Sequence, residues 1–129
     1  MIEPLHITLR EIPHREQAYD TVGNWTELSN GRWLITVSNM GDWRYGLLVA
    51  VHELVEMALC KHRGIIESDV TQFDLDFEAK RVDGNTDEPG HDPAAPYHRE
   101  HVLAEMLEQQ LANMLGVDWN RYDEAVSSL

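Results

Sequence analysis

The longest apolar stretch of the chain runs from Gly46 to Cys60 and has the character of a buried helix. Its only polar residues are His52, Glu53 and Glu56. At about 100° per residue, these three side chains fall within a strip roughly 100° wide on a helix that is otherwise apolar all round. Because such a helix has to be packed on most of its surface, we expect it to be the central helix of the fold.

The residues around this stretch indicate where helices begin and end. Asp42 is a candidate N-cap for the central helix, and three basic residues followed by Gly64 are typical of a C-terminus. A second helix is expected over residues 68–81. A third is expected over residues 96–116, where proline suits the first turn and glycine the end. Asp118 is placed to cap a short terminal helix.

The first third of the chain has the period of two residues that is typical of strands. Leu5, Ile7 and Leu9 alternate with polar neighbours, as in a half-buried strand. Residues 25–28 and 32–37 flank an Asn-Gly pair, which is a strong signal for a hairpin. The sequence therefore predicts an α+β fold, in which a small antiparallel N-terminal sheet of about three strands packs with three main helices in a single domain over residues 1–129.

Composition and charge narrow the classes of function. A hydrophobic content of 43% fits a globular protein, and no apolar run reaches the roughly 18 residues needed to span a bilayer. The net charge of −13 disfavours nucleic acid as a partner, because its binding depends on Lys and Arg. The first residues lack a secretory pattern, and the single cysteine, Cys60, is expected in the core. We therefore expect a cytoplasmic protein without a membrane or nucleic-acid partner.

The polar strip of the central helix is the main candidate for chemistry. His52 and Glu56 lie one helical turn apart, so they can offer two ligands to one divalent metal ion. Residues 52–56 read H-E-x-x-E, a variant of the H-E-x-x-H helix in which two residues bind zinc and the intervening glutamate is the general base. We predict His52 and Glu56 as metal ligands, zinc as the metal and Glu53 as the catalytic base. The alternative is that the strip is the narrow solvent-exposed side of the helix.

A second pair of the same kind lies on the helix expected over residues 96–116. His101 and Glu105 repeat the four-residue spacing, and His98 lies one turn before His101. Two facing helices with such pairs can assemble three or four ligands around one ion. We predict His101 as the third ligand, with His98, Glu105 and His91 as alternatives.

The apolar residues of this helix argue in the other direction. They are expected to form its core-facing stripe, and His101 points more than 100° away from that stripe. A ligand role for His101 therefore requires a central position of the helix, beneath the loop at residues 82–96. The stripe consists of Leu103, Leu107, Leu111 and Met114.

The loop at residues 82–96 contains three prolines and two glycines and has no periodicity. Long loops of this kind are usually functional, and its ends join two helices near the polar strip, so we predict that it forms a lid over His52 and Glu56. Asp74 and Glu78 also lie four residues apart, and a solvated acidic helix face is the expected role for them.

With these residues in view, the chain resembles a family of small uncharacterised proteins of tailed phages and prophages. The resemblance rests on residues 41–65, on F-D-x-x-F-E at residues 73–78, and on residues 88–105 followed by G-V-D-W. It implies a phage origin and carries no assigned activity. Separately, a sheet followed by this helix is similar to minimal zincin-like metallopeptidases. In that comparison His52 matches the first ligand and Glu53 the general base, and Glu56 stands where the family has a second histidine.

These observations lead to one expected function and two alternatives. We expect a metal-dependent hydrolase of zincin-like type, with peptidase as its nearest class. The first alternative is a non-catalytic phage accessory or binding protein whose His/Glu strip is a structural network. The second is a Mg²⁺-dependent nucleotide pyrophosphohydrolase, because Glu53-x-x-Glu56 and Glu105-x-x-Glu108 resemble the paired acidic motifs of those enzymes. The strands and histidines make that second alternative the less favoured one.

Overall fold

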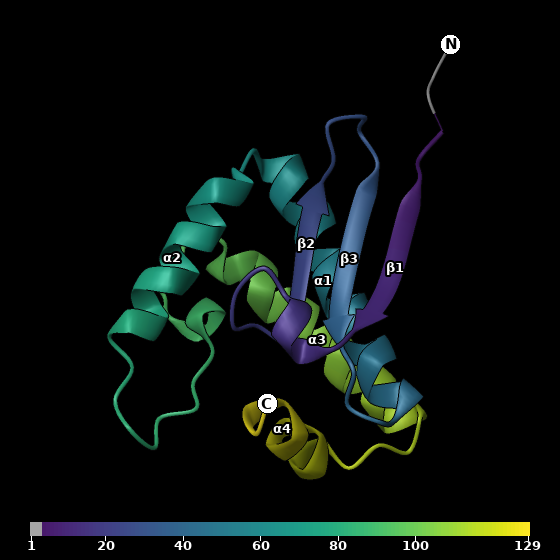
Figure 1. Ribbon diagram of the computed structural model, residues 1–129, viewed down its shortest axis with the longest axis vertical. Helices are drawn as coiled ribbons and strands as arrows, with labels where there is room; N and C mark the ends of the chain where they lie inside the picture. Colours follow the sequence, from purple (N-terminus) through teal and green to yellow (C-terminus); the bar gives the residue numbers. More distant parts are fainter. Residues whose placement is uncertain (1–3) are drawn as a thin grey trace.

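Figure 1 shows the computed structural model of the chain, which describes residues 4–129. A three-stranded sheet is followed by four helices, which is the α+β class predicted from the sequence. The predicted domain range also includes residues 1–3, which lie outside the described residues. The strands are β1 (Ile7–Ile12), β2 (Gly23–Glu27) and β3 (Trp33–Ser38). The helices are α1 (Trp43–Arg63), α2 (Glu67–Ala79), α3 (His98–Met114) and α4 (Trp119–Ser127). Two short 3₁₀ turns are η1 (His14–Glu16) and η2 (Pro89–His91).

The sheet is mixed, which corrects the prediction of a wholly antiparallel sheet. β2 and β3 form the expected antiparallel hairpin, with Trp25 opposite Ile35. β1 runs parallel to β3, with Ile7 beside Trp33, so the strand order is β1-β3-β2. β1 and β2 are not neighbours, because β3, whose Ile35 is almost fully buried, occupies the centre of the sheet. Residues 13–22 connect β1 at one edge of the sheet to β2 at the other.

β1 is an edge strand that α1 leaves largely uncovered. Its pairing puts Ile7 and Leu9 beside Trp33 and Ile35, on the same face of the sheet. However, α1 packs mainly against β2 and β3, so Ile7 is 43% and Leu9 51% exposed. The alternation of residues 5–9 therefore predicts the strand correctly and overestimates its burial.

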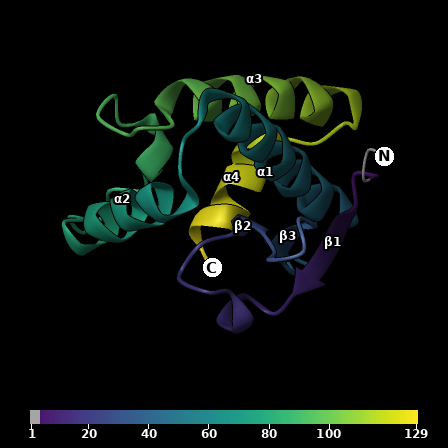
Figure 2. The ribbon, with the colours of Figure 1, turned by 90° about the horizontal axis from the view of Figure 1, so that it is seen from above.

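α1 is the central helix, as its composition predicts. Figure 2 shows it between the sheet and α3, and it contacts β2 and β3 on one side and α3 on the other. Asp42 caps its first turn by accepting a hydrogen bond from the backbone N–H of Arg44, and Gly64 ends it with a φ of 75°. Leu48 and Cys60 are fully buried, which confirms the core role of the cysteine.

α3 turns its polar side inward, so the prediction that its leucine stripe faces the core is wrong. Leu103, Leu107 and Met114 are 42%, 39% and 83% exposed, and of the predicted stripe Leu111 alone packs against the core. The small residues Ala104 and Ala112 face α1 and let the two helices pack closely. The charged residues of α3 that are buried beside these alanines are Glu100, His101 and Glu108.

The remaining helices differ only slightly from the sequence prediction. α2 begins one residue before Ser68, and α3 begins two residues after Pro96. α4 is capped by Asp118, as predicted, which accepts a hydrogen bond from the backbone N–H of Arg121. In the part of the chain that the structure describes, no helix combines the length and the apolar character needed to cross a bilayer.

Candidate metal centre

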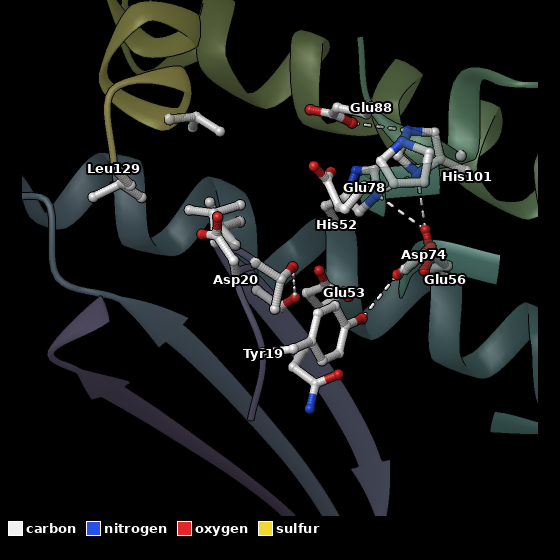
Figure 3. A pocket seen from close by; sticks show the side chains of 18 of the residues that line it. Tyr19, Asp20, His52, Glu53, Glu56, Asp74, Glu78, Glu88, His101 and Leu129 are labelled. Carbon is white, nitrogen blue, oxygen red and sulfur yellow. Dashed lines mark hydrogen bonds and ion pairs between the residues drawn. The ribbon is translucent and has the colours of Figure 1, made fainter. Parts of the chain in front are cut away.

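The structure brings the three predicted ligand residues together in the interior, where they form a triangle (Figure 3). Nε2 of His52 lies 3.1 Å from Oε2 of Glu56 and 3.1 Å from Nδ1 of His101. Nδ1 of His101 lies 3.0 Å from the same oxygen of Glu56. All three residues are buried, with exposed fractions of 8% or less. The His52–Glu56–His101 triangle is therefore a buried group that could hold a metal ion.

Hydrogen bonds alone cannot satisfy all three sides of this triangle. With its pKa at about 2, Glu56 is ionised and its oxygen only accepts, while each of the two ring nitrogens either donates a proton or accepts one. Three atoms share only two roles, so at least one short contact joins two donors or two acceptors. Such a contact is costly in a buried site, where the low local dielectric strengthens it. A cation removes the conflict, because all three atoms can then present lone pairs to it.

The dimensions of the triangle also suit a divalent ion. Ligand atoms about 2.1 Å from Zn²⁺ lie roughly 3.0 Å apart in octahedral geometry and roughly 3.4 Å apart in tetrahedral geometry. The observed separations of 3.0–3.1 Å fall in this range. Three protein ligands leave at least one coordination position for another molecule, which is typical of catalytic zinc sites.

Glu108 holds the His52 ring in the orientation that the triangle needs. Nδ1–H of His52 donates to Oε1 of Glu108 across 2.7 Å, which leaves Nε2 of the ring for the triangle. Oε2 of Glu108 accepts a hydrogen bond from the hydroxyl group of Tyr122 on α4. A carboxylate behind a ligating histidine fixes the ring tautomer and raises the basicity of the other nitrogen.

Glu56 is oriented in a similar way from the sheet. The indole N–H of Trp25 on β2 donates to Oε1 of Glu56 across 3.1 Å, and Oε2 is left for the triangle. Trp25 is itself 5% exposed, so this carboxylate is held by a rigid and buried neighbour. Each residue of α1 in the triangle therefore has one atom fixed by a supporting side chain.

Burial and neighbouring charges shift the pKa values of the triangle residues in opposite directions. Burial lowers the pKa of His52, but hydrogen bonds to Glu108 and Glu56 outweigh it and raise that pKa well above its usual value. Burial also lowers the pKa of His101, which Glu56 and Glu88 nevertheless raise to about 9. Burial raises the pKa of Glu56, yet its hydrogen bonds to the two imidazoles bring it down to about 2. Without a metal, protonated imidazoles and carboxylates form a buried ion-pair network.

Glu53 lies beside the triangle and is not part of it. Its side chain lines the same cavity, and Figure 3 shows it beneath His52. Burial, followed by the nearby charge of Glu56, raises the pKa of Glu53 to about 8. β2 approaches closely here, because a Cβ atom added at Gly23 would lie 2.6 Å from Oε1 of Glu53. Among the described residues, none hydrogen-bonds to this carboxyl group, so its oxygens face the cavity.

A cavity of about 320 Å³ opens beside the triangle and gives a small molecule access to it. The loop at residues 82–96 forms part of its wall, which agrees with the predicted position of the loop, and its movement as a lid stays a prediction. The wall combines acidic side chains with aromatic ones. The wall includes Tyr19, Glu53, Asp74, Glu88 and Tyr97.

The three alternative third ligands lie outside the triangle. Nδ1–H of His98 donates to the carbonyl oxygen of Gly90 across 2.9 Å. Nε2 of His91 lies 2.9 Å from Oε2 of Glu105, on the outer side of His101. Of the four candidates, His101 alone reaches the His52–Glu56 pair.

Asp74 corrects the expectation of a solvated acidic face on α2. The hydroxyl group of Tyr19 donates to Oδ2 of Asp74 across 2.8 Å, and the hydroxyl group of Tyr97 donates to Oδ1. Burial, partly offset by these two hydrogen bonds, raises the pKa of Asp74 to about 6. Asp74 and Glu78 both line the cavity, because α2 lies beside it and does not face open solvent on this side.

The supporting residues are the part of the site that sequence reasoning missed. Glu108 lies seven residues, or two helical turns, after His101, so an inward His101 requires an inward Glu108. That signal was available in the spacing. The roles of Trp25, Glu88 and Tyr122 depend on contacts between distant elements and have no local signal. Searches of protein-family models, curated proteins and solved structures found no match to this chain.

Proposed function

We propose that this protein is a metal-dependent hydrolase of zincin-like type, in which His52, Glu56 and His101 bind one divalent ion and Glu53 is the general base. The observation that supports it most directly is the triangle of buried ligand atoms, whose contacts cannot all be hydrogen bonds. Two imidazoles and one carboxylate are a donor set that favours Zn²⁺ over Mg²⁺ or Ca²⁺, which prefer oxygen ligands. When bound, the ion would supply Lewis-acid activation of water and of a substrate carbonyl group.

The remaining chemistry falls to residues of the chain. Glu53 is adjacent to a ligand in the sequence and faces the cavity, where it can accept a proton from water and pass it to a leaving group. A divalent cation beside it favours its ionised form, which brings a pKa of about 8 towards the range of a base that works at neutral pH. Glu108 and Trp25 keep the ligand atoms in place while this proton moves.

The charge of the cavity favours a neutral scissile bond. Carboxylates line it, and they repel phosphate and carboxylate substrates. An amide or ester bond of a peptide-like substrate fits this environment better than a phosphoanhydride, so the cavity supports the peptidase class over a nucleotide pyrophosphohydrolase. The carboxylates in question are Glu53, Asp74, Glu78, Glu88 and Asp123.

One observation favours the non-catalytic alternative. Without a metal, the imidazoles of the triangle pair with Glu56, Glu88 and Glu108 and form a network that ties α1 to α3. In an accessory or binding protein of phage, such a network would have a structural role only. Metal binding separates the two hypotheses, because a purely structural network gains nothing from Zn²⁺.

The test is a calorimetric titration of the metal-free protein, purified without a histidine tag, with Zn²⁺ at neutral pH. We expect binding to the triangle that His52→Ala abolishes, together with a rise in melting temperature on adding Zn²⁺, since an ion at 100 times its Kd stabilises the fold by about 2.7 kcal/mol. His62→Ala replaces an exposed histidine and is the matched control. If the wild-type protein and His52→Ala take up Zn²⁺ equally, the proposal is wrong.

Two further variants separate catalysis from binding. Glu53→Gln should keep the affinity for Zn²⁺ and lose hydrolysis of a fluorogenic peptide library, because a neutral amide cannot accept the proton. Glu56→Gln should weaken Zn²⁺ binding itself. Equal loss of Zn²⁺ in both variants would make Glu53 a ligand, and hydrolysis retained by Glu53→Gln would rule out its role as the base.

A further inference from the structure

The far side of the His101 ring faces a second group of possible ligands. Nε2 of His101 lies 2.9 Å from Oε2 of Glu88. Nε2 of His91 lies 2.9 Å from Oε2 of Glu105 and 3.9 Å from Oε2 of Glu88. One ligand atom from each of Glu88, His91 and His101 lies within 4.8 Å of the others. Figure 3 shows contacts from the His101 ring both to Glu88 and to Glu56 of the triangle.

An independent observation marks this side of the ring as unsatisfied. Nε2 of His101 is buried, and its one close polar neighbour on this side is Oε2 of Glu88, which forms an ion pair with it at 2.9 Å but lacks the geometry of a hydrogen bond. The His101 side chain is 7% exposed. Within the described residues 4–129, Nε2 of His101 is the one buried side-chain nitrogen or oxygen atom without a hydrogen-bond partner. A buried polar atom that makes no hydrogen bond calls for an explanation, and an ion bound between this ring and Glu88 would supply one.

The loop that carries Glu88 and His91 is fixed against this ring by Gly90. A Cβ atom added at Gly90 would lie 2.2 Å from Cγ of His101, so only glycine permits the backbone of η2 to lie so close to the imidazole. The carbonyl oxygen of Gly90 also accepts the hydrogen bond from His98 on α3. The contact at Gly90 therefore fixes the backbone of Glu88 and His91 near Nε2 of His101, and their side chains keep some freedom to move.

We propose that Glu88, His91 and Glu105 bind a second divalent ion and that His101 is a ligand shared between this ion and the triangle. Two carboxylates and two imidazole nitrogens are a complete set of four ligands for Zn²⁺. When both ions are bound, the ring of His101 donates a lone pair from each nitrogen, and its remaining ring proton is released to solvent. The second site uses three residues outside the triangle, so it can be tested apart from the proposed hydrolase function.

The second site should bind more weakly than the triangle. Two ligands of one ion can be at most about 4.2 Å apart, which is twice a zinc–ligand bond length. Nε2 of His91 lies 3.9 Å from Oε2 of Glu88, close to this limit and wider than the roughly 3.4 Å between tetrahedral zinc ligands, so these two side chains have to move closer together to bind an ion in that geometry. Those side chains are 39% and 37% exposed, which leaves them free to move at an entropic cost.

The first experiment measures Zn²⁺ bound per chain, by elemental analysis after equilibrium dialysis of the full-length tag-free protein. We expect two ions for the wild type and for the control His62→Ala, one for His91→Ala, one for His52→Ala and none for His101→Ala. One ion in the wild type with an unchanged value in His91→Ala would overturn the second site and leave the triangle intact. One ion lost in His91→Ala but none in His52→Ala would support the second site and overturn the triangle.

The second experiment tests whether His101 is shared. Two Cu²⁺ ions joined through one imidazole ring are magnetically coupled, so the electron paramagnetic resonance signal per copper should fall by more than half between one and two equivalents of Cu²⁺. His91→Ala should retain the full signal of a single isolated ion. If the protein with two Cu²⁺ ions gives twice the signal of one, the two sites do not share the ring and the proposal fails.

Discussion

At the scale of single residues, Glu108 supports the candidate metal centre without belonging to the triangle. It accepts a hydrogen bond from His52 on one oxygen and from Tyr122 on the other. This arrangement fixes which nitrogen of His52 is available to a metal. The orientation of the ligand therefore depends on a side chain of α3 and a hydroxyl group of α4.

We predict that Glu108→Gln lowers the affinity of the triangle for Zn²⁺ by about 10- to 100-fold, the usual effect of removing a carboxylate behind a ligating histidine. The neutral amide accepts a weaker hydrogen bond and leaves the His52 ring free to rotate. Isothermal titration calorimetry measures the change. Glu124→Gln, on the exposed side of α4, is the control and should bind Zn²⁺ as the wild type does. An unchanged affinity in Glu108→Gln would show that Glu108 does not orient the ligand.

The residues of the triangle could be predicted from the sequence only as far as helical spacing reaches. His52 and Glu56 are one turn apart on an apolar helix, which is a local signal. His101 lies 49 residues later, and its place in the triangle depends on how α1 and α3 face each other. Trp25 contributes from β2, and no periodicity in the sequence connects a strand residue to Glu56.

At the scale of secondary structure elements, α3 shows how an apolar stripe can mislead. The inward side of this helix meets the polar strip of α1, so charged and small residues face the core there. The apolar side consequently remains exposed, with Met106 at 51% and Met114 at 83%. The prediction failed because hydrophobic periodicity assumes that the partner surface is apolar. The parallel pairing of β1 was missed for a related reason, since local pattern does not specify strand order.

This orientation of α3 can be tested by measuring stability. We predict that Met106→Gln and Met114→Gln each change the free energy of unfolding by less than about 0.5 kcal/mol, because these side chains are exposed. Ala104→Leu should destabilise the fold by about 1–3 kcal/mol, because Ala104 is fully buried and faces α1. Urea denaturation of the metal-free proteins measures all three. A larger loss in Met106→Gln than in Ala104→Leu would place the methionine face in the core and reverse the helix.

At the scale of the whole molecule, Asp74 joins segments that are far apart in the sequence. It lies on α2, Tyr19 precedes β2, and Tyr97 is the last residue before α3. The titratable groups near it on other elements include Glu53 and Glu56 on α1 and His101 on α3. Burial raises its pKa to about 6 in the folded protein, against 3.8 in the unfolded chain.

The pH dependence of stability follows from that shift. The folded protein holds a proton on Asp74 more tightly than the unfolded chain does, so the contribution of this group is greatest below pH 4 and is lost as the pH rises through about 6. We predict that the free energy of unfolding of Asp74→Asn rises relative to that of the wild type between pH 4 and 7. The total rise should be at most about 3 kcal/mol.

Urea denaturation of the metal-free proteins across this pH range measures the difference. Asp76→Asn, on the exposed side of the same helix, is the control and should show no such trend. A gap between wild type and Asp74→Asn that is constant with pH would mean that Asp74 titrates alike in the folded and unfolded states.

The assembly of the triangle from α1 and α3 has a consequence for the moment at which an ion can be captured. A ribosome adds roughly 5–20 residues per second, so the 49 residues between His52 and His101 take roughly 2–10 s to synthesise. During this interval a nascent chain offers only the His52–Glu56 pair, which is too few ligands to choose between metals. If the triangle binds an ion as we propose, selection between metals falls to the closure of α3 onto α1. The ion that is abundant at that step, in whichever compartment the chain finishes folding, would then be the one bound.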